Sequence, residues 1–288
     1  MDRLLMCKPL HFGIEYEINP WMSKARQADR QRAVRQWEEI HGILCSLPDV
    51  QVALLEPGEG LPDLVFAANA GVVHGHAFIR SNFRYRERAR EEPLWEGWFA
   101  AHGYRIITLP QATKFEGEGD LFVVGDIAYA GWGFRSHHSS HAAVRDALGM
   151  PVASLKLVDP YFYHLDTCFA PLGGGRVMYY PGAFAPESRA SIEKHFPDRI
   201  VVPTEEARRF VCNAIVVGDT AITTADCPAS EAALRAWGYQ VRAVDTSEFI
   251  KSGGSAKCMA LFLERDAAFA QGIVTAKGAE GIRRRKAS

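Results

Sequence analysis

The stretch "DLFVVGDIAYAG", residues 120–131, decides the fold, because it places two short apolar runs on either side of a Gly-Asp turn. Two such runs around a tight turn predict a β-hairpin. The arrangement recurs as "NAIVVGDTAITT" at 213–224, and less strictly as "DLVFAANAGVVHGHAFI" at 63–79 and "CFAPLGGGRVMYYPGAF" at 168–184. One hairpin repeated along the chain indicates a repeat architecture rather than a linear two-domain chain.

A segment with helical spacing and then one more apolar run follow each hairpin, so the repeated unit is strand, strand, helix, strand. These segments cover residues 91–110, 139–158, 187–203 and 229–245. In two of them a glycine stands between helix and strand, Gly103 in "AAHGY" and Gly238 in "RAWGY". Glycine at this place predicts a left-handed helix cap.

The first unit is less regular than the others. "HFGIEYE" at 11–17 predicts an opening strand, a helix is expected from about Arg26 to Leu47, and "QVALLE" at 51–56 predicts another strand. With this unit included, the chain holds five units of roughly 40 to 60 residues. Such a spacing favours a radial or stacked α/β fold.

The composition favours a small-molecule partner. Of the 288 residues, 48% are hydrophobic, and 33 basic against 34 acidic residues give a formal net charge of −1. This charge offers no field that would attract nucleic acid or an anionic membrane. No apolar stretch approaches the roughly 20 residues that span a bilayer, and the first residues lack a signal-peptide pattern, so a cytoplasmic location is expected. The oligomeric state stays open, a homo-oligomer included.

No shift in composition marks a linker inside residues 1–265, so we expect a single domain there. Residues 266–288 end in a basic, small-residue stretch, which predicts a frayed C-terminal extension.

Cys258 is the cysteine with the most unusual surroundings. The six cysteines include no C-x-x-C pair, which argues against a disulfide framework and a thiolate zinc site. "SGGSAKCMAL" at 252–261 places a glycine pair before Cys258, which fits a buried core cysteine or a nucleophile beside a substrate. "KCMALFLER" at 257–265 has a helix-like pattern, and a helix start suits both alternatives.

His164 and Asp166 are two residues apart in "YFYHLDTCFAP", residues 161–171. In an extended strand both side chains would point to the same face and could line one pocket. The alternative is a histidine satisfied within a strand, but an acid among aromatic residues is costly to bury without a partner.

Three acidic residues alternate with glycines in "KFEGEGDLF", residues 114–122, directly before an apolar run. Glu116, Glu118 and Asp120 would repel one another unless a cation lies between them, either a metal ion or an organic cation. The pattern lacks the ligand rhythm of an EF-hand, and an exposed turn is the alternative.

Asp63 and Asn69 stand in the otherwise apolar "GLPDLVFAANAGVV", residues 60–73. An unpaired amide there would be destabilising, so Asn69 is expected either to hydrogen-bond a specific group or to form a turn before Gly71.

Two stretches are rich in arginine. "SNFRYRERAREEP" at 81–93 is typical of a solvated helix start, whereas Arg135 follows an aromatic, glycine-rich turn that suits bidentate binding of a carboxylate. His137, His138 and His141 lie nearby but lack the spacing of a zinc site, so no metal and no other cofactor is expected.

Six motifs, taken in order, resemble the guanidine-modifying superfamily of arginine deiminases, dimethylarginine dimethylaminohydrolases, arginine dihydrolases and amidinotransferases. They are "LPDLVFAANAG", "FEGEGD", "GFRSHHSS", "YFYHLDTCF", "NAIVVG" and "GGSAKCMAL", with "YEINPWM" near the start. The resemblance covers about residues 10–265 and implies a pentein fold, a five-bladed α/β propeller of ββαβ units with pseudo-fivefold symmetry around a central site. Five units were also counted from the hairpins.

The resemblance implies four catalytic residues. Cys258 matches the nucleophile and His164 the general acid and base, while Glu116 and Asp166 match the carboxylates that clasp the guanidinium. A thiolate would attack the guanidinium carbon, His164 would protonate the departing nitrogen, and water would release the product from a covalent thiouronium.

Four further residues match positions that bind the substrate. Arg88 and Arg135 correspond to residues that bind the α-carboxylate, and Asp63 to a substrate-contacting aspartate. Asn69 resembles the asparagine of arginine dihydrolases and succinylarginine dihydrolases at a position where deiminases and many dimethylargininases carry aspartate. An amide can donate to a ureido oxygen, so a citrulline intermediate could stay bound for a second hydrolysis.

The resemblance therefore favours an arginine dihydrolase, which converts arginine to ornithine, carbon dioxide and two ammonia molecules. A dimethylarginine dimethylaminohydrolase or an arginine deiminase, each releasing citrulline, is the alternative. An amidinotransferase and a non-catalytic binding protein of the same fold rank lower.

Overall fold

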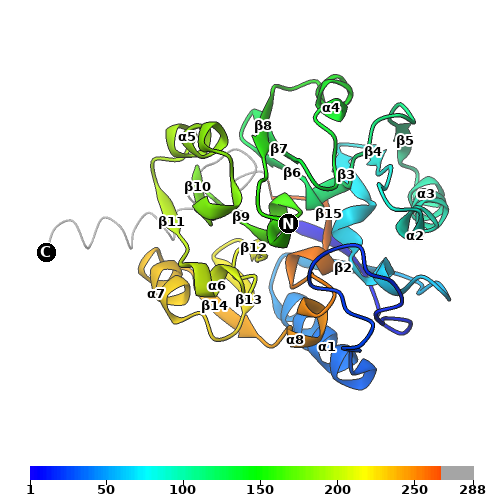
Figure 1. Ribbon diagram of the computed structural model, residues 1–288, viewed down its shortest axis with the longest axis horizontal. Coiled ribbons are helices and arrows are strands. Elements are labelled where there is room, and N and C mark those ends of the chain that lie inside the picture. The colour runs from blue at the N-terminus through cyan, green and yellow to red at the C-terminus, as the bar shows by residue number, and fades with distance from the viewer. Residues whose placement is uncertain (267–288) are drawn as a thin grey trace, which may run out of the picture.

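The structure, a computed structural model, describes residues 1–266. Five three-stranded sheets stand in a ring, one strand of each sheet nearest the centre and the longer helices at the rim (Figure 1). The strands of the five sheets are β15 (Leu261–Glu264), β1 (Asp2–Cys7) and β2 (Val50–Leu55); β3 (Gly71–His74), β4 (Ala77–Arg80) and β5 (Arg105–Thr108); β6 (Leu121–Val124), β7 (Ile127–Trp132) and β8 (Val152–Lys156); β9 (Phe169–Gly173), β10 (Arg176–Tyr179) and β11 (Arg199–Val201); β12 (Ile215–Val217), β13 (Thr220–Thr224) and β14 (Gln240–Val244).

Each sheet repeats the predicted unit. The first strand pairs antiparallel with the second, and a helix then leads to a third strand that pairs parallel with the second, as with Leu121↔Ala130 and Ala128↔Val152. The α-helices are α1 (Arg30–Ser46), α2 (Arg86–Ala89), α3 (Glu92–Ala101), α4 (Ser140–Leu148), α5 (Pro186–His195), α6 (Thr204–Ala207), α7 (Pro228–Ala236) and α8 (Ser247–Ile250). Gly103 and Gly238 have φ of 82° and 91°, which confirms the left-handed conformation predicted between helix and strand.

The opening strand was predicted at the wrong place. The first strand is β1, whereas Phe12 and Ile14 are buried in a loop. The carbonyl of Phe12 accepts a hydrogen bond from Arg30 Nε at 3.0 Å, and the backbone of Ile14 bonds to the side chain of Gln27. Side chains thus satisfy the backbone groups that a sheet would otherwise pair.

Helix α1 begins later than the sequence predicted. The side chain of Asp29 accepts a hydrogen bond from the backbone N–H of Arg32 and so caps the helix at its N-terminus. Trp37, Ile40 and Leu44 form its buried face, which packs on the first sheet and on strands β12 and β13 of the neighbouring sheet.

The helix-like reading of residues 257–265 was also wrong. The segment forms one 3-10 turn, Lys257–Met259, and then strand β15. β15 pairs antiparallel with β1, with Leu4 opposite Phe262 and Leu5 opposite Leu261, so the last strand closes the ring against the first. A long-range partner therefore outweighs a local helical pattern.

Within residues 1–266, no helix is long and apolar enough to cross a membrane. The extension predicted at 266–288 lies, from residue 267 onward, outside the described residues.

Truncating Leu5 to Ala should lower the free energy of unfolding by about 2–5 kcal/mol, because it leaves a cavity in the closing sheet. Leu5 is fully buried in β1 and lies opposite Leu261 of β15 and Ala53 of β2. Val201→Ala is the control, since that side chain is 55% exposed and should change the value by less than about 0.5 kcal/mol. Urea denaturation measures both variants, and equal small losses would contradict a structural role for the closure.

Candidate active site

Five of the predicted site residues lie in or directly before the turns that precede the inner strands, namely Asn69, Glu116, His164, Asp166 and Cys258. The other three lie elsewhere: Asp63 in η1 (Pro62–Val65), Arg88 in α2 and Arg135 after β7. Four of the turns before inner strands are 3-10 helices: η2 (Ala67–Ala70) before β3, η3 (Gly117–Gly119) before β6, η5 (Leu165–Thr167) before β9 and η7 (Lys257–Met259) before β15. The fifth turn lies before β12 and contains Asn213. The pseudo-fivefold repeat thus brings one short polar segment from each blade to a common centre.

Cys258 lies in η7, and its side chain is buried. Its thiol donates a hydrogen bond to Asp166 Oδ2 at 3.2 Å, and its Sγ accepts one from Asn213 Nδ2 at 3.1 Å. Burial and the neighbouring Asp166 carboxylate raise the pKa of the thiol well above its ordinary value. The thiol is therefore protonated at neutral pH in the absence of a ligand.

Asp166 is fully buried, and burial raises the pKa of its carboxyl to about 6. While Oδ2 accepts from Cys258, Oδ1 has no hydrogen-bond partner among the described residues. A buried carboxylate oxygen without a partner is costly, so it is an open acceptor for a cationic ligand.

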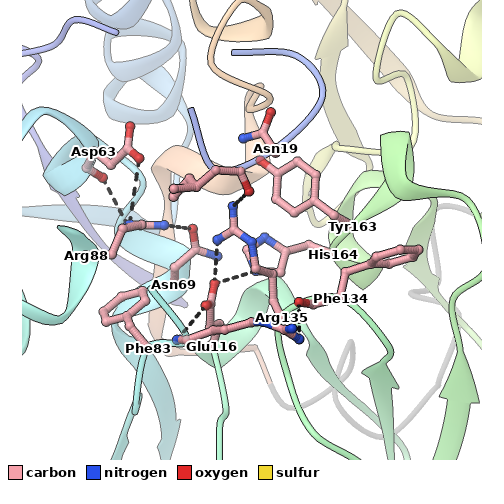
Figure 2. Close-up of polar contacts among 12 residues, drawn as sticks. Asn19, Asp63, Asn69, Phe83, Arg88, Glu116, Phe134, Arg135, Tyr163 and His164 are labelled. Carbon is pink, nitrogen blue, oxygen red and sulfur yellow. Dashed lines mark hydrogen bonds and ion pairs between the residues drawn. The ribbon is translucent and has the colours of Figure 1, made fainter. Parts of the chain in front are cut away.

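His164 Nε2 lies 2.8 Å from Glu116 Oε2, and the same oxygen is 2.9 Å from Arg135 Nη1 (Figure 2). Burial alone would raise the pKa of Glu116, but Arg135 and His164 outweigh it and hold that pKa well below its usual range. The sequence predicted that His164 and Asp166 lie in one strand, and this prediction was wrong. His164 precedes η5 and Asp166 lies within it, so a turn rather than a pleat brings both to the site.

The three acids of the glycine-rich segment do not share one cation. Glu118 pairs with Lys257 Nζ at 2.8 Å, and Asp120 accepts hydrogen bonds from Ser136 Oγ at 2.6 Å and from the N–H of Leu165 at 3.0 Å. Together with the Glu116 contacts, each carboxylate has its own protein partner. The segment is also largely buried, so the alternative of an exposed turn is wrong.

Asn69 lies in η2, and its Oδ1 accepts a hydrogen bond from Arg88 Nη1 at 2.6 Å (Figure 2). This bond fixes the amide so that the Nδ2 group is the open side, and Nδ2 has no partner among the described residues. A Cβ on Gly119 would collide with Nδ2 and lie 3.2 Å from His164 Nδ1, so glycine leaves room where Asn69 and His164 meet.

Arg88 is buried rather than part of a solvated helix start, which corrects that interpretation. Its Nε and Nη2 donate to the two oxygens of Glu91, at 2.7 and 2.8 Å, and Nη2 also donates to the carbonyl of Asp63. Asp63 is buried too, accepts from Tyr16 at 3.0 Å and lies 4.0 Å from Arg88 Nε. These contacts make Arg88 the group that orients Asn69.

Arg135 is buried between the rings of Tyr85 and Tyr163, with its guanidinium carbon 4.9 and 4.6 Å from their centroids. A cavity of about 370 Å³ lies beside it, lined also by Glu17 and Asn19 of the loop that follows β1. Arg135 is the predicted site residue that lines this cavity.

A larger cavity, of about 630 Å³, lies at the other end of the strands, around the hairpin turns at Gly75 and Gly125. None of the predicted site residues lines it. Lys257 and Glu118 do, so the ion pair behind Cys258 faces that cavity.

Residues 1–266 contain no group of three or more His, Cys, Asp or Glu side chains placed to hold a metal ion. Of the histidines near Arg135, His141 is buried with Nδ1 2.7 Å from Ser154 Oγ. Its ring lies 5.2 Å from that of His138.

Asn213 is the residue that the sequence interpretation missed. The motif "NAIVVG" was recognised, but no role followed for its asparagine. The available signal was position, since Asn213 precedes an apolar inner strand at the place where Asn69 and Cys258 precede theirs.

Comparison with known proteins identifies relatives of this chain. A family model described as N,N dimethylarginine dimethylhydrolase, eukaryotic, matches residues 9–264. The chain is 42% identical, over 90% of its length, to the bifunctional arginine dihydrolase/ornithine cyclodeaminase ArgZ of Synechocystis, but spans only 37% of that protein. It is 40% identical to the N(G),N(G)-dimethylarginine dimethylaminohydrolase of Mycobacterium tuberculosis, covering 90% of this chain and 85% of that protein.

Solved structures show the same fold. The N-terminal domain of ArgZ, described as an arginine dihydrolase bound to product, superposes with a TM-score of 0.89 at 41% identity, covering 92% of this chain and 98% of that one. A Pseudomonas aeruginosa dimethylarginine dimethylaminohydrolase complexed with citrulline gives a TM-score of 0.77 at 24% identity, covering 90% and 98%. The five-bladed α/β propeller expected from the resemblance is confirmed.

Iodoacetamide at pH 7 should modify Cys45 well before Cys258, because Cys45 is the exposed cysteine and the Cys258 thiol is buried and protonated. The fraction of labelled Cys258 should rise as the pH increases, and mass spectrometry of the cysteine-containing peptides measures it. Cys45→Ser, the matched control, should remove the fast phase alone. Labelling of Cys258 as fast as that of Cys45 at pH 7 would contradict a protonated thiol.

Proposed function

Since the chain belongs to the family of dimethylarginine dimethylaminohydrolases and arginine dihydrolases, hydrolases that act on amidine C–N bonds, we propose that it is an arginine dihydrolase. Arginine and two water molecules would give ornithine, carbon dioxide and two ammonia molecules. The observation that carries this choice is the open Nδ2 donor of Asn69.

The substrate guanidinium would bind where the site leaves acceptors open. Asp166 Oδ1 lacks a partner beside the Cys258 thiol, and Glu116 retains its negative charge under the influence of Arg135 and His164. A planar cation with several N–H donors satisfies such carboxylate oxygens. Arg135, which lines the cavity of about 370 Å³, would bind the α-carboxylate, while Asp63 and Arg88 would support the wall of the pocket.

The cation would also activate the nucleophile. A positive charge next to Cys258 lowers the pKa of its thiol, which the free site keeps high, so the thiolate forms when substrate is present, and its proton would pass to His164. The thiolate then adds to the guanidinium carbon and forms an S–C bond. His164, held by Glu116, protonates the departing nitrogen as its C–N bond breaks, and ammonia leaves a covalent thiouronium. Water deprotonated by the same histidine adds to this carbon, and the S–C bond breaks to return the thiolate.

Asn69 would determine how often the cycle runs. After the first hydrolysis the side chain carries a neutral ureido group, whose oxygen accepts hydrogen bonds. Asn69 Nδ2 can donate to that oxygen because Arg88 already holds Oδ1. The donor favours retention of the citrulline for a second attack by Cys258, whereas a carboxylate at this position would repel the ureido oxygen.

A dimethylarginine dimethylaminohydrolase is the second candidate. The family model favours it, and so does the relative from Mycobacterium tuberculosis, which is 40% identical over 90% of this chain. Both activities use the same cysteine and histidine, so substrate competition between arginine and methylated arginine distinguishes them.

Incubation with arginine should release two ammonia molecules for each ornithine, with citrulline only as a transient. Asn69→Asp should accumulate citrulline and reduce the formation of ornithine by at least about tenfold. The variant loses a hydrogen bond to the ureido oxygen and repels that oxygen, and the two effects together should cost more than about 1.4 kcal/mol of binding free energy. Amino-acid chromatography and an ammonia assay measure the products. Cys258→Ser, the inactive control, should form neither, and citrulline without ornithine from the unaltered protein would refute the dihydrolase proposal.

The value of kcat/KM for arginine should fall about tenfold per pH unit below pH 6, because Asp166 becomes protonated there and no longer attracts the guanidinium. The sign follows from burial, which raises the pKa of Asp166 to about 6, so the carboxylate is charged above that pH and neutral below it. Burial also raises the pKa of Asp120 to about 6, so Asp120→Asn is the control. If kcat/KM still falls below pH 6 in Asp120→Asn, the fall is due to Asp166. A value of kcat/KM that does not change between pH 7 and 5 would exclude Asp166 as its cause.

A further inference from the structure

Asn213 makes an unusually complete set of contacts with the proposed nucleophile. Its side chain is fully buried in the turn before β12. Oδ1 accepts from the backbone N–H of Cys258 at 3.1 Å, and Nδ2 donates to Cys258 Sγ at 3.1 Å and to the carbonyl of Asp166 at 3.1 Å. One carboxamide therefore contacts both the backbone and the sulfur of the same cysteine.

These contacts fix the orientation of the amide. Rotating the carboxamide by 180° would set its NH2 group against the N–H of Cys258 and its oxygen against the carbonyl of Asp166, so both contacts would become repulsive. Asn213 Nδ2 therefore stays next to Cys258 Sγ as a hydrogen-bond donor, and Oδ1 does not take its place.

The backbone around Asn213 is also tightly constrained. Phe210 is fully buried with φ of 65°, a conformation that a bulky side chain adopts only at a cost. Its carbonyl accepts from the N–H of Asn213 at 2.9 Å, and the carbonyl of Asn213 accepts from the N–H of Lys257 at 3.2 Å. The turn before β12 is thus hydrogen-bonded to the segment that contains Cys258. The strained backbone at Phe210 lies in the same turn as Asn213 and helps to position its carboxamide.

We infer that Asn213 is a catalytic residue that stabilises negative charge on Cys258 Sγ through its Nδ2–H donor, an inference that rests on the proposed function because it requires Cys258 to be the nucleophile. With it, every blade places a polar group in or directly before the turn that precedes its inner strand: Asn69, Glu116, Asp166, Asn213 and Cys258.

The role of Asn213 balances that of Asp166. Asp166 accepts a hydrogen bond from the thiol, and its negative charge opposes formation of the thiolate, whereas the neutral N–H donor of Asn213 stabilises the thiolate. The sulfur is anionic twice in each hydrolysis. It is so before the S–C bond forms and again when that bond breaks and the electron pair returns to sulfur. Asn213 acts at both stages.

The test is the rate at which iodoacetamide modifies Cys258 at pH 9, followed by mass spectrometry in Asn213→Ala and Asn213→Asp. Losing a hydrogen bond to a charged sulfur should raise the thiol pKa by about one to two units. The greater nucleophilicity of a more basic thiolate offsets part of this, so labelling should slow roughly three- to tenfold in Asn213→Ala. Asn213→Asp keeps the acceptor for the Cys258 N–H and adds a negative charge near the sulfur, so it should slow labelling further.

A merely structural role predicts the opposite sign. Cys258 is 3% exposed, so a variant that loosens the turn should label faster. Thr223→Val is the matched control, because Thr223 is equally buried and its Oγ1 bonds the carbonyl of Val211 in the same turn without touching Cys258. It should change the labelling rate by less than about twofold and leave kcat for arginine near its original value.

The kcat for arginine should fall at least about tenfold in both Asn213 variants, in step with the slower labelling. Faster or unchanged labelling in Asn213→Ala would overturn the inference, whatever the effect on kcat. The proposed function fails differently, namely if Cys258→Ser retains turnover, so the two ideas are tested separately.

Discussion

The antiparallel pairing of β15 with β1 is the constraint on which the rest of the structure depends. It joins residues 261–264 to residues 2–7, two segments from opposite ends of the described chain, and closes five sheets into a ring. Without this pairing β1 would become an edge strand with unpaired backbone groups, and β15 would have no partner strand in its sheet. Closure also places the turn that carries Cys258 beside η2, so the nucleophile reaches the centre because the first strand receives the last one.

The centre of the ring is a cluster of buried charges that mostly satisfy one another. Glu116 lies against Arg135 and His164, Glu118 against Lys257, and Arg88 against Glu91. Buried ion pairs of this kind contribute little net stability, and removing one member leaves an uncompensated charge. Their value here is positional, since Glu116 contacts His164, Arg88 orients Asn69, and the pair of Glu118 with Lys257 fixes the residue next to Cys258.

Two atoms stand out against this background of satisfied groups. Asp166 Oδ1 is an acceptor and Asn69 Nδ2 a donor, both buried and without partners among the described residues. An acceptor suits a guanidinium and a donor suits the oxygen of a ureido group, which correspond to the start and the middle of the proposed two-step hydrolysis. The high thiol pKa of Cys258 fits the same scheme, because it keeps the free cysteine unreactive until a cation arrives.

The sequence by itself determined four hairpin units, the total of five units, the left-handed glycines at 103 and 238, and the family, since turn chemistry, strand alternation and short motifs are local properties. It misplaced the first strand at 11–17 and expected a helix at 257–265, because the pairing of β1 with β15 links residues more than 250 positions apart. It also placed His164 and Asp166 in a strand and overlooked Asn213. Only the tertiary structure decided which atoms in the site are already hydrogen-bonded and which are open, because that depends on the five turns meeting at one point, and no local pattern records such a meeting.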